Sequence, residues 1–167
     1  TSFGSKVIIP GTGVIMNNEM DDFSIAPGVP NAFGLVGAEA NAVAAGKRPL
    51  SSMSPTIVLK DGKPILAVGA AGGPTIITQT LLAIIHTIDY GRPLKEALAQ
   101  PHFHHQWAPD QIRIEKKAGE KVLAELRRRG HALKVYDRIG ATQAVALRDG
   151  KFEAAHDPRL KGKATAY

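Results

Sequence analysis

The sequence predicts an α+β fold with antiparallel strands, and three observations lead to this prediction. Asp61-Gly62 and Asp149-Gly150 each separate two short apolar runs, and an Asp-Gly pair suits a type I′ hairpin turn because both central residues need positive φ. A continuous apolar stretch of helical length, at 75–88, follows the first pair. Hairpins on either side of a helical region favour antiparallel pairing.

The first third of the chain is expected to hold little regular structure. Residues 5–16 alternate loosely between apolar and small side chains and are interrupted by Pro10 and Gly11, so we expect extended chain around a turn. Residues 17–55 show no periodicity and are rich in proline, glycine and small polar residues. A long irregular stretch is usually a functional loop or a disordered one, and the residues it holds favour a functional loop.

Local patterns predict the remaining elements in chain order. The runs around Asp61 give a hairpin at 56–69, and the apolar stretch at 75–88 gives a helix that is buried on most sides. Gly130 follows an amphipathic stretch, where a C-cap glycine belongs. The further elements are a short helix at 93–99, a short strand at 112–115, an amphipathic helix at 118–129, a strand at 132–136 and a second hairpin at 143–155.

Composition excludes several classes of protein. With 167 residues, of which 44% are apolar and 22% charged, the chain suits a single domain, 1–167, with a sizeable core. The absence of cysteine excludes a disulfide framework, a thiol nucleophile and a cysteine-based zinc site. The net charge of +6 is scattered and aromatic residues are few, so we expect no nucleic-acid partner. Glycines and Pro74 interrupt the uncharged stretch 64–88, so we expect no membrane span.

An acidic cluster is the most informative piece of the irregular stretch. Glu19, Asp21 and Asp22 place three carboxylates within four residues, and such groups repel one another unless a cation lies among them. The cation could be a metal ion, an arginine or the ammonium group of a substrate. A solvated acidic turn is the alternative, and spacing alone favours it.

Two adjacent hydroxyls form a second candidate. Ser51 and Ser52 lie between Pro49 and Pro55, which restrict the backbone, so the hydroxyls could donate to a carboxylate with little ordering cost. An ordinary serine-rich turn is an equally good interpretation.

Paired glycines between a predicted strand and a predicted helix form a third candidate. Gly72 and Gly73 allow successive backbone N–H groups to point at an anion, aided by the helix N-terminus. This arrangement suits an oxyanion hole or a phosphate cradle. The Lys-Ser/Thr pair of a P-loop is missing, which argues against a nucleotide, and a plain tight turn is the alternative.

Three histidines close together suggest a metal site, although weakly. No appropriately spaced carboxylate accompanies His102, His104 and His105. Histidines of this kind more often pack and hydrogen-bond in a structural loop. We therefore expect no metal and no cofactor.

Taken together and in this order, the motifs resemble the small subunit of the gamma-glutamyltranspeptidase family, over essentially the whole chain. The run from Lys47 to Thr56, KRPLSSMSPT, is highly specific to that family. The other matching segments are Ser2-Phe3-Gly4, Asn17 to Phe23, Pro27 to Asn31, Gly72-Gly73, Pro101 to Trp107, Gly140 to Gln143 and Asp157 to Arg159.

The resemblance implies an N-terminal nucleophile hydrolase with an αββα four-layer sandwich. In that family a precursor cuts itself into a large and a small subunit, which form a heterodimer. The new N-terminal Thr becomes the nucleophile and its α-amine the general base. The enzyme transfers or hydrolyses the γ-glutamyl group of glutathione and other γ-glutamyl amides, in the periplasm or outside the cell.

Roles for individual residues follow from the same resemblance. Gly72 and Gly73 would form the oxyanion hole, and Ser51 and Ser52 would bind the α-carboxylate of the glutamyl group. Glu19 and Asp22 would hold its α-ammonium group. Residues 27–37 resemble a lid loop, and Phe33 stands where an aromatic gate, often Tyr, would cover the pocket.

The sequence departs from the family pattern at two places. Thr1 matches a segment downstream of the family's nucleophile, so we expect the nucleophile upstream of residue 1 and no activity from these 167 residues alone. Ala70 and Ala71 replace a frequent Ser-Pro. Two alternatives remain, a non-enzymatic module that binds an amino acid or pairs with a subunit, and a related acylase that acts on another amide.

Overall fold

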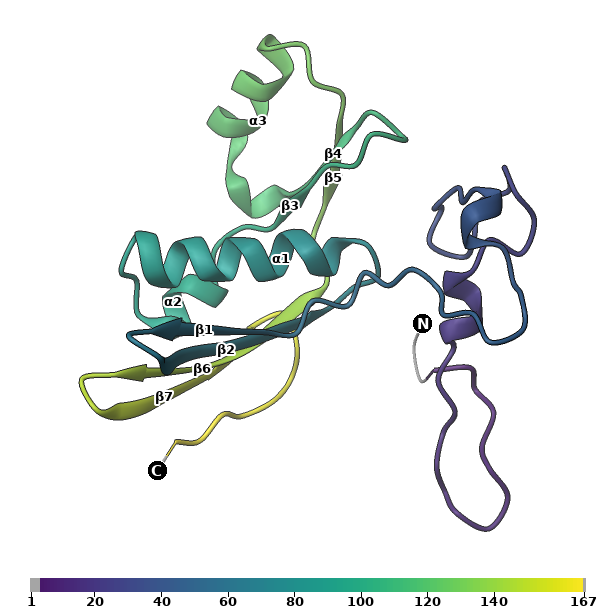
Figure 1. Ribbon diagram of the computed structural model, residues 1–167. Coiled ribbons are helices and arrows are strands. Elements are labelled where there is room, and N and C mark those ends of the chain that lie inside the picture. The colour runs from purple at the N-terminus through teal and green to yellow at the C-terminus, as the bar shows by residue number, and fades with distance from the viewer. Residues whose placement is uncertain (1–3, 167) are drawn as a thin grey trace. The chain divides into compact units, whose positions relative to one another are not determined.

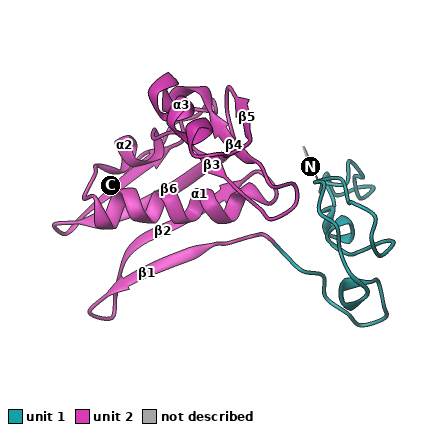
Figure 2. Ribbon diagram, turned by 90° about the horizontal axis from the view of Figure 1, so that it is seen from above, with its two compact units in different colours: residues 1–51 teal, residues 52–167 magenta. Residues whose placement is uncertain are grey.

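The computed structural model describes residues 4–166. The chain divides into two compact units, residues 1–51 and residues 52–167, coloured separately in Figure 2. They differ in kind, because the first is built from loops and the second from sheets and helices.

Unit 1 contains little regular structure, as predicted. The segment 5–16 runs out and back around a turn, closed by the backbone bond from Ser5 N to Met16 O at 2.9 Å and a bridge between Ile8 and Ile15. Its two short 3-10 turns are η1, Glu19–Asp22, and η2, Glu39–Asn41.

The main sheet of unit 2 has four antiparallel strands in the order β1-β2-β6-β7. Both predicted hairpins are confirmed, since Asp61 and Asp149 have φ of 52° and 51° and the glycine after each has φ of 75°. The strands are β1 Thr56–Lys60, β2 Lys63–Ala71, β6 Ala141–Arg148 and β7 Lys151–His156.

Two helices cover one face of this sheet (Figure 1). Helix α1, Thr75–Ile84, continues into a π-helical turn, Ile85–Asp89, and α2 is Leu94–Leu98. The predicted helices at 75–88 and 93–99 are therefore confirmed. The first is not buried on most sides as predicted, since Ile77 and Leu81 are 52% and 53% exposed. Period-2 alternation along the strands turns small and branched apolar side chains toward the helices, where the core is formed by Leu66, Val68, Ala83, Leu94, Leu98, Ala144, Ala146 and Ala155.

A second sheet has three strands in the order β3-β4-β5, namely Phe103–His104, Ile112–Glu115 and Leu133–Tyr136. Strands β4 and β5 pair in parallel, which departs from the predicted antiparallel pairing. Parallel neighbours need a crossover connection, and α3, Glu120–Arg128, supplies it. Gly130 has φ of 89° and follows that helix closely, as predicted.

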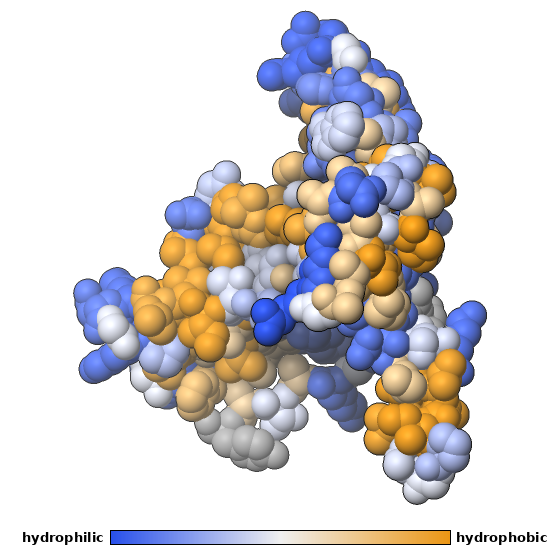
Figure 3. All heavy atoms as spheres, turned by 45° about the vertical axis from the view of Figure 1, so that its right-hand side comes forward, coloured by the Kyte–Doolittle hydropathy of each residue, from blue (hydrophilic) through white to orange (hydrophobic). Residues whose placement is uncertain are grey.

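Apolar side chains also lie at the surface. On the sheet face opposite α1, Ile57, Val145 and Phe152 are 66%, 42% and 60% exposed. The loop 7–16 of unit 1 exposes six large apolar side chains, Val7, Ile8, Ile9, Val14, Ile15 and Met16. Figure 3 shows orange patches of such side chains on one face of the molecule. No helix in the described part of the chain has both the length and the apolarity that a membrane crossing requires.

Candidate functional site

The Gly72–Gly73 turn joins the end of β2 to the start of α1. Gly72 has φ of 145° and Gly73 has φ of 59°, conformations that residues with a Cβ rarely adopt. A Cβ on Gly72 would also lie 2.6 Å from the hydroxyl oxygen of Thr75. The turn therefore requires glycine for its backbone and for the space around it.

In this turn the carbonyl oxygens of the two glycines accept hydrogen bonds, whereas their backbone N–H groups donate none within the described residues. Gly72 O accepts from Thr75 N at 3.3 Å, and Gly73 O accepts from Ile76 N at 3.0 Å, which starts α1. Among residues 4–166, no acceptor is bound to the N–H of Gly72 or of Gly73. Two adjacent N–H groups at a helix N-terminus can donate to an oxyanion.

The acidic cluster forms the turn η1. Burial raises the pKa of Asp22, and the neighbouring carboxyl of Glu19, through its charge and a hydrogen bond, and the charge of Asp21 raise it further. No Lys or Arg among residues 4–166 forms an ion pair with Glu19 or Asp22. Among the described residues, the cluster thus has no cationic partner.

Two asparagines that the sequence prediction did not single out hold this turn in place. Asn31 Nδ2 donates to Asp21 O at 3.0 Å, and Asn41 Nδ2 donates to Asp22 O at 2.8 Å. Their side-chain oxygens accept backbone N–H groups in turn, that of Asn41 from Leu50 at 3.0 Å. Asparagine in a proline- and glycine-rich stretch is a recognised turn signal, and this signal could have pointed to Asn31 and Asn41.

The predicted serine pair lies where the two units meet along the chain. Ser51 ends unit 1 and is exposed, whereas Ser52 begins unit 2, is half-buried and accepts at its carbonyl from Ser54 Oγ at 3.2 Å. The structure thus brings Glu19 close to Asp22, and Gly72 next to Gly73. The three predicted pairs are distributed over both units.

The predicted lid loop, 27–37, closes on itself within unit 1. Gly28 N donates to Gly37 O at 3.0 Å, and Pro30 and Val36 form a bridge. Phe33 is half-buried, and its N–H donates to Asn31 Oδ1 at 3.0 Å. A cavity of about 210 Å³ lies at the base of the loop, lined by Asp21, Ile25, Ala26, Val29, Pro30, Asn31 and Ala32.

The three histidines each have a separate partner. His102 Nδ1 lies 2.7 Å from Ile139 O, His104 Nδ1 lies 3.1 Å from Thr78 Oγ1, and His105 Nε2 lies 2.9 Å from Asp110 Oδ1. The described residues contain no group of three His, Cys, Asp or Glu side chains that could hold a metal ion.

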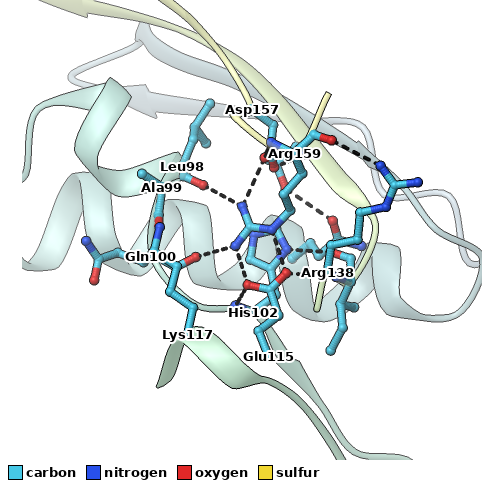
Figure 4. A network of polar contacts seen from close by, with 12 residues as sticks. Leu98, Ala99, Gln100, His102, Glu115, Lys117, Arg138, Asp157 and Arg159 are labelled. Atoms are coloured by element: carbon cyan, nitrogen blue, oxygen red, sulfur yellow. Dashed lines mark hydrogen bonds and ion pairs between the residues drawn. The ribbon is translucent and has the colours of Figure 1, made fainter. Parts of the chain in front are cut away.

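A buried ionic network lies close to His102 (Figure 4). The guanidinium of Arg159 donates to both carboxylate oxygens of Glu115, at 2.6 and 2.5 Å, and to Asp157 Oδ1 at 3.0 Å. It also donates to the carbonyls of Leu98 and Gln100. Burial works to raise the pKa of Glu115, but the hydrogen bonds from Arg159 and from the His102 and Ile139 N–H groups hold it below the usual value.

Sequence reasoning assigned no role to this network. Its members lie far apart along the chain, since Glu115 and Arg159 are 44 residues from each other. The available signals were two segments that the family resemblance includes, Pro101 to Trp107, which contains His102, and Asp157 to Arg159. Thr1, which the sequence analysis rejects as a nucleophile, lies outside the described residues.

Comparison with known proteins gives consistent results. The sequence profile named Gamma-glutamyltranspeptidase matches residues 1–167. The glutathione hydrolase proenzyme of Escherichia coli is 47% identical over 167 residues, which is 99% of this chain and 29% of that protein. The chain thus spans about three-tenths of the length of that relative.

Solved structures agree with the sequence relatives. A mutant gamma-glutamyltranspeptidase of Helicobacter pylori superposes with a TM-score of 0.88 at 47% identity, covering 96% of this chain and 89% of that one. An acivicin-inhibited gamma-glutamyltranspeptidase, described for the roles of its C-terminus in autoprocessing and catalysis, gives 0.88 at 47%, with 97% and 89% covered. The α+β class, as part of an N-terminal nucleophile hydrolase fold, is confirmed. The chain belongs to the gamma-glutamyltranspeptidase family.

Proposed function

We propose that the full-length protein that contains this chain transfers γ-glutamyl groups, from glutathione and other γ-glutamyl amides, to water or to an amine. One observation carries the proposal. Gly72 and Gly73 present two adjacent N–H groups, without an acceptor among residues 4–166, at the start of α1. Relatives named glutathione hydrolase proenzyme support the choice of reaction.

The proposed chemistry is acyl transfer through a covalent intermediate. A Thr hydroxyl from a segment upstream of residue 1 attacks the γ-carbonyl carbon, and its own α-amine takes the proton. The carbonyl oxygen becomes an oxyanion and accepts from the N–H groups of Gly72 and Gly73, each worth roughly 3–4 kcal/mol in other acyl-transfer enzymes. The C–N bond then breaks, the amine leaves with the proton, and water or an acceptor amine attacks the acyl-enzyme.

The glutamyl head group gives the other predicted pairs their roles. Glu19 and Asp22 bind the α-ammonium group, while the hydroxyls of Ser51 and Ser52 donate to the α-carboxylate. The raised pKa of Asp22 supports this assignment, because it reflects burial beside other carboxyls with no cation among the described residues. A bound ammonium group would relieve that repulsion.

The lid and the partner complete the proposal. Residues 27–37 act as a lid over the pocket, with Phe33 as an apolar cover, and residues 1–167 form most of a small subunit. The other subunit comes from the same precursor, which the word proenzyme in the relatives' names supports. The apolar sheet face around Ile57, Val145 and Phe152 offers surface for such a partner. The family resemblance supports a periplasmic or extracellular location.

Two synthetic substrates test the function. The full-length protein should release p-nitroaniline from γ-glutamyl-p-nitroanilide. It should act much more weakly on glutaryl-p-nitroanilide, which lacks the α-ammonium group. A preference for the glutaryl compound would contradict the roles of Glu19 and Asp22 and favour an acylase for another amide.

A second arm uses the 167 residues alone, which should show no turnover. Turnover by this chain that is lost in Thr1→Ala would contradict the upstream nucleophile. Glutamate binding by calorimetry, without turnover by the full-length protein, would instead support a non-enzymatic binding module.

A further inference from the structure

Gln79 lies on α1, one turn after Thr75, and is fully buried. Its Nε2 donates to Thr75 Oγ1 at 2.7 Å and to Ala71 O at 3.3 Å. Thr75 Oγ1 in turn donates to Gly72 O at 2.9 Å. One amide and one hydroxyl therefore hold two successive backbone carbonyls of the turn that follows β2.

These two carbonyls determine where the glycine N–H groups point. A peptide unit is planar and trans, so its N–H is directed opposite to its C=O. Ala71 O belongs to the same peptide unit as the N–H of Gly72, and Gly72 O to the same unit as the N–H of Gly73. Fixing the two carbonyl oxygens thus fixes the directions of both donors.

The orientation of the Gln79 amide is itself constrained. Thr142 Oγ1 donates to Gln79 Oε1 at 3.4 Å, and the backbone N–H of Thr142 donates to Asp157 Oδ2 at 2.8 Å. Thr142 and Asp157 are fully buried. Because the Gln79 oxygen faces a hydroxyl donor, its NH₂ group is left to face the two acceptors near the turn.

The Gln79 amide packs closely against Gly140. A Cβ on Gly140 would lie 2.2 Å from Gln79 Nε2 and 2.4 Å from Ala71 O. Gly140 is therefore the residue that makes room for the bond between them. Strand β6, which begins directly afterwards, brings Thr142 to the other side of the amide.

We propose that Gln79 and Thr75 are positioning residues for acyl transfer: they hold the Ala71 and Gly72 carbonyls so that the N–H groups of Gly72 and Gly73 converge on the reacting oxygen. The inference rests on the oxyanion role proposed above. Neither side chain touches the substrate. Without these bonds the Ala71 carbonyl loses the Gln79 donor and the Gly72 carbonyl loses the Thr75 hydroxyl, keeping the longer bond from Thr75 N at 3.3 Å. Either peptide unit can then rotate more easily, and a rotated N–H no longer meets the oxyanion.

Kinetics of the full-length protein test the inference. Thr75→Val is nearly isosteric and removes the hydroxyl, Thr75→Ser retains it, and Gln79→Leu removes the amide. With γ-glutamyl-p-nitroanilide we expect Thr75→Val and Gln79→Leu to lower kcat by about tenfold or more while KM changes less than about twofold, because oxyanion contacts form in the transition state. Thr75→Ser should keep kcat near that of the unmodified protein.

Gln100→Leu is the matched control, since among residues 4–166 the Gln100 amide donates only to Glu96 O on α2. It should leave kcat unchanged. A purely structural role for Gln79 and Thr75 predicts lower melting temperatures with kcat preserved, and that result would overturn the inference. So would equal losses in Thr75→Val and Thr75→Ser. If Gln79→Leu does not fold, the comparison of Thr75→Val with Thr75→Ser still tests the inference.

A readout that needs no activity separates this inference from the proposed function. The N–H groups of Thr75 and Ile76 donate to the carbonyls of Gly72 and Gly73, so hydrogen exchange over 71–76 reports on the turn. We expect faster exchange there in Thr75→Val than in Thr75→Ser, with no change over β1. Unchanged exchange over 71–76 would overturn the inference. Absence of turnover in the unmodified protein would contradict the proposed function. The exchange comparison would then still test whether the Thr75 hydroxyl holds the turn.

Discussion

Units 1 and 2 are held together by different interactions. Unit 2 has two sheets and an apolar core in which Leu66, Leu94 and Leu98 are no more than 2% exposed. In its described part, unit 1 has two short 3-10 turns and isolated β-bridges, and side-chain amides such as that of Asn41 bind its backbone in place of a sheet ladder. Under the proposed function, unit 2 fixes the Gly72 and Gly73 N–H groups that meet developing charge. Unit 1 supplies Glu19, Asp22 and Ser51, adaptable groups that bind the substrate, together with Ser52 at the start of unit 2.

Because unit 2 holds the apolar core and the buried ion pairs, we expect the largest change in the free energy of unfolding from a substitution there. Arg159→Met leaves the buried carboxylates of Glu115 and Asp157 without their guanidinium partner. Removing one partner of a buried ion pair costs about 3–5 kcal/mol, and we expect a loss of that size in the free energy of unfolding. Denaturant titration of the full-length protein measures it. Arg128→Met on the surface of α3, where the guanidinium binds Glu125, should leave the midpoint unchanged, and equal losses would contradict the distinction.

The next largest effect should be a loss of kcat in Gly72→Ala. Gly72→Ala places a Cβ 2.6 Å from Thr75 Oγ1 at a φ of 145°, which displaces the peptide units on either side. Losing an oxyanion donor lowers kcat by about 10²–10³-fold, and KM should change little. Steady-state kinetics with γ-glutamyl-p-nitroanilide provides the measurement. Gly91→Ala, at a turn with open space around it, is the control for strain at positive φ. A preserved kcat in Gly72→Ala would remove the turn from the mechanism.

In unit 1 we expect binding and stability to change in opposite directions. Asp22→Asn removes a carboxylate whose pKa is raised by burial and by Glu19 and Asp21. A raised folded-state pKa means that the ionised carboxyl destabilises the fold as pH rises above 3.8. The variant should therefore be slightly more stable at neutral pH. It should nevertheless raise KM about 10- to 100-fold, because a hydrogen bond to a charged group contributes roughly 1.5–3 kcal/mol.

The same residue predicts a pH dependence. Substrate binding should weaken as pH falls through the raised pKa of Asp22, because the protonated carboxyl no longer attracts an ammonium group. The KM profile of the unmodified protein should show this, and that of Asp22→Asn should be flatter. Glu39→Gln, an exposed carboxylate change in the same unit, should leave KM and its pH profile as they are. A parallel rise in KM for Glu39→Gln would point to a general charge effect.

The smallest expected effect is local. Asn41→Ala removes the bonds from its side chain to Asp22 O and from Leu50 N, worth about 1–2 kcal/mol together. Limited proteolysis should cut faster within 17–50, while exchange over β2 and β6 stays the same. Asn41→Asp keeps the acceptor for Leu50 and should be intermediate. If cleavage also rises in unit 2, the two units are not independent in stability.

Features that depend on neighbouring residues could be read from the sequence. Asp61-Gly62 and Asp149-Gly150 specify their turns locally, because two adjacent residues adopt positive φ there. The apolar helix after Gly73 and the glycine that follows the end of α3, Gly130, are also specified by neighbouring residues. The candidate pairs Gly72–Gly73 and Glu19 with Asp22 are also near neighbours, and family resemblance gave them roles that remain predictions.

Only the tertiary structure decided the long-range features. The parallel pairing of β4 with β5, the partners of Arg159, and the contact of Gln79 with Thr142, 63 residues away, join segments that share no local pattern. Such contacts depend on which buried polar groups find partners once the sheets and helices pack. Sequence alone determined where the chain turns and which stretches form the hairpins and the main helices, because those depend on backbone preference and apolar spacing. The folded core determined which distant side chains hold the Gly72–Gly73 turn.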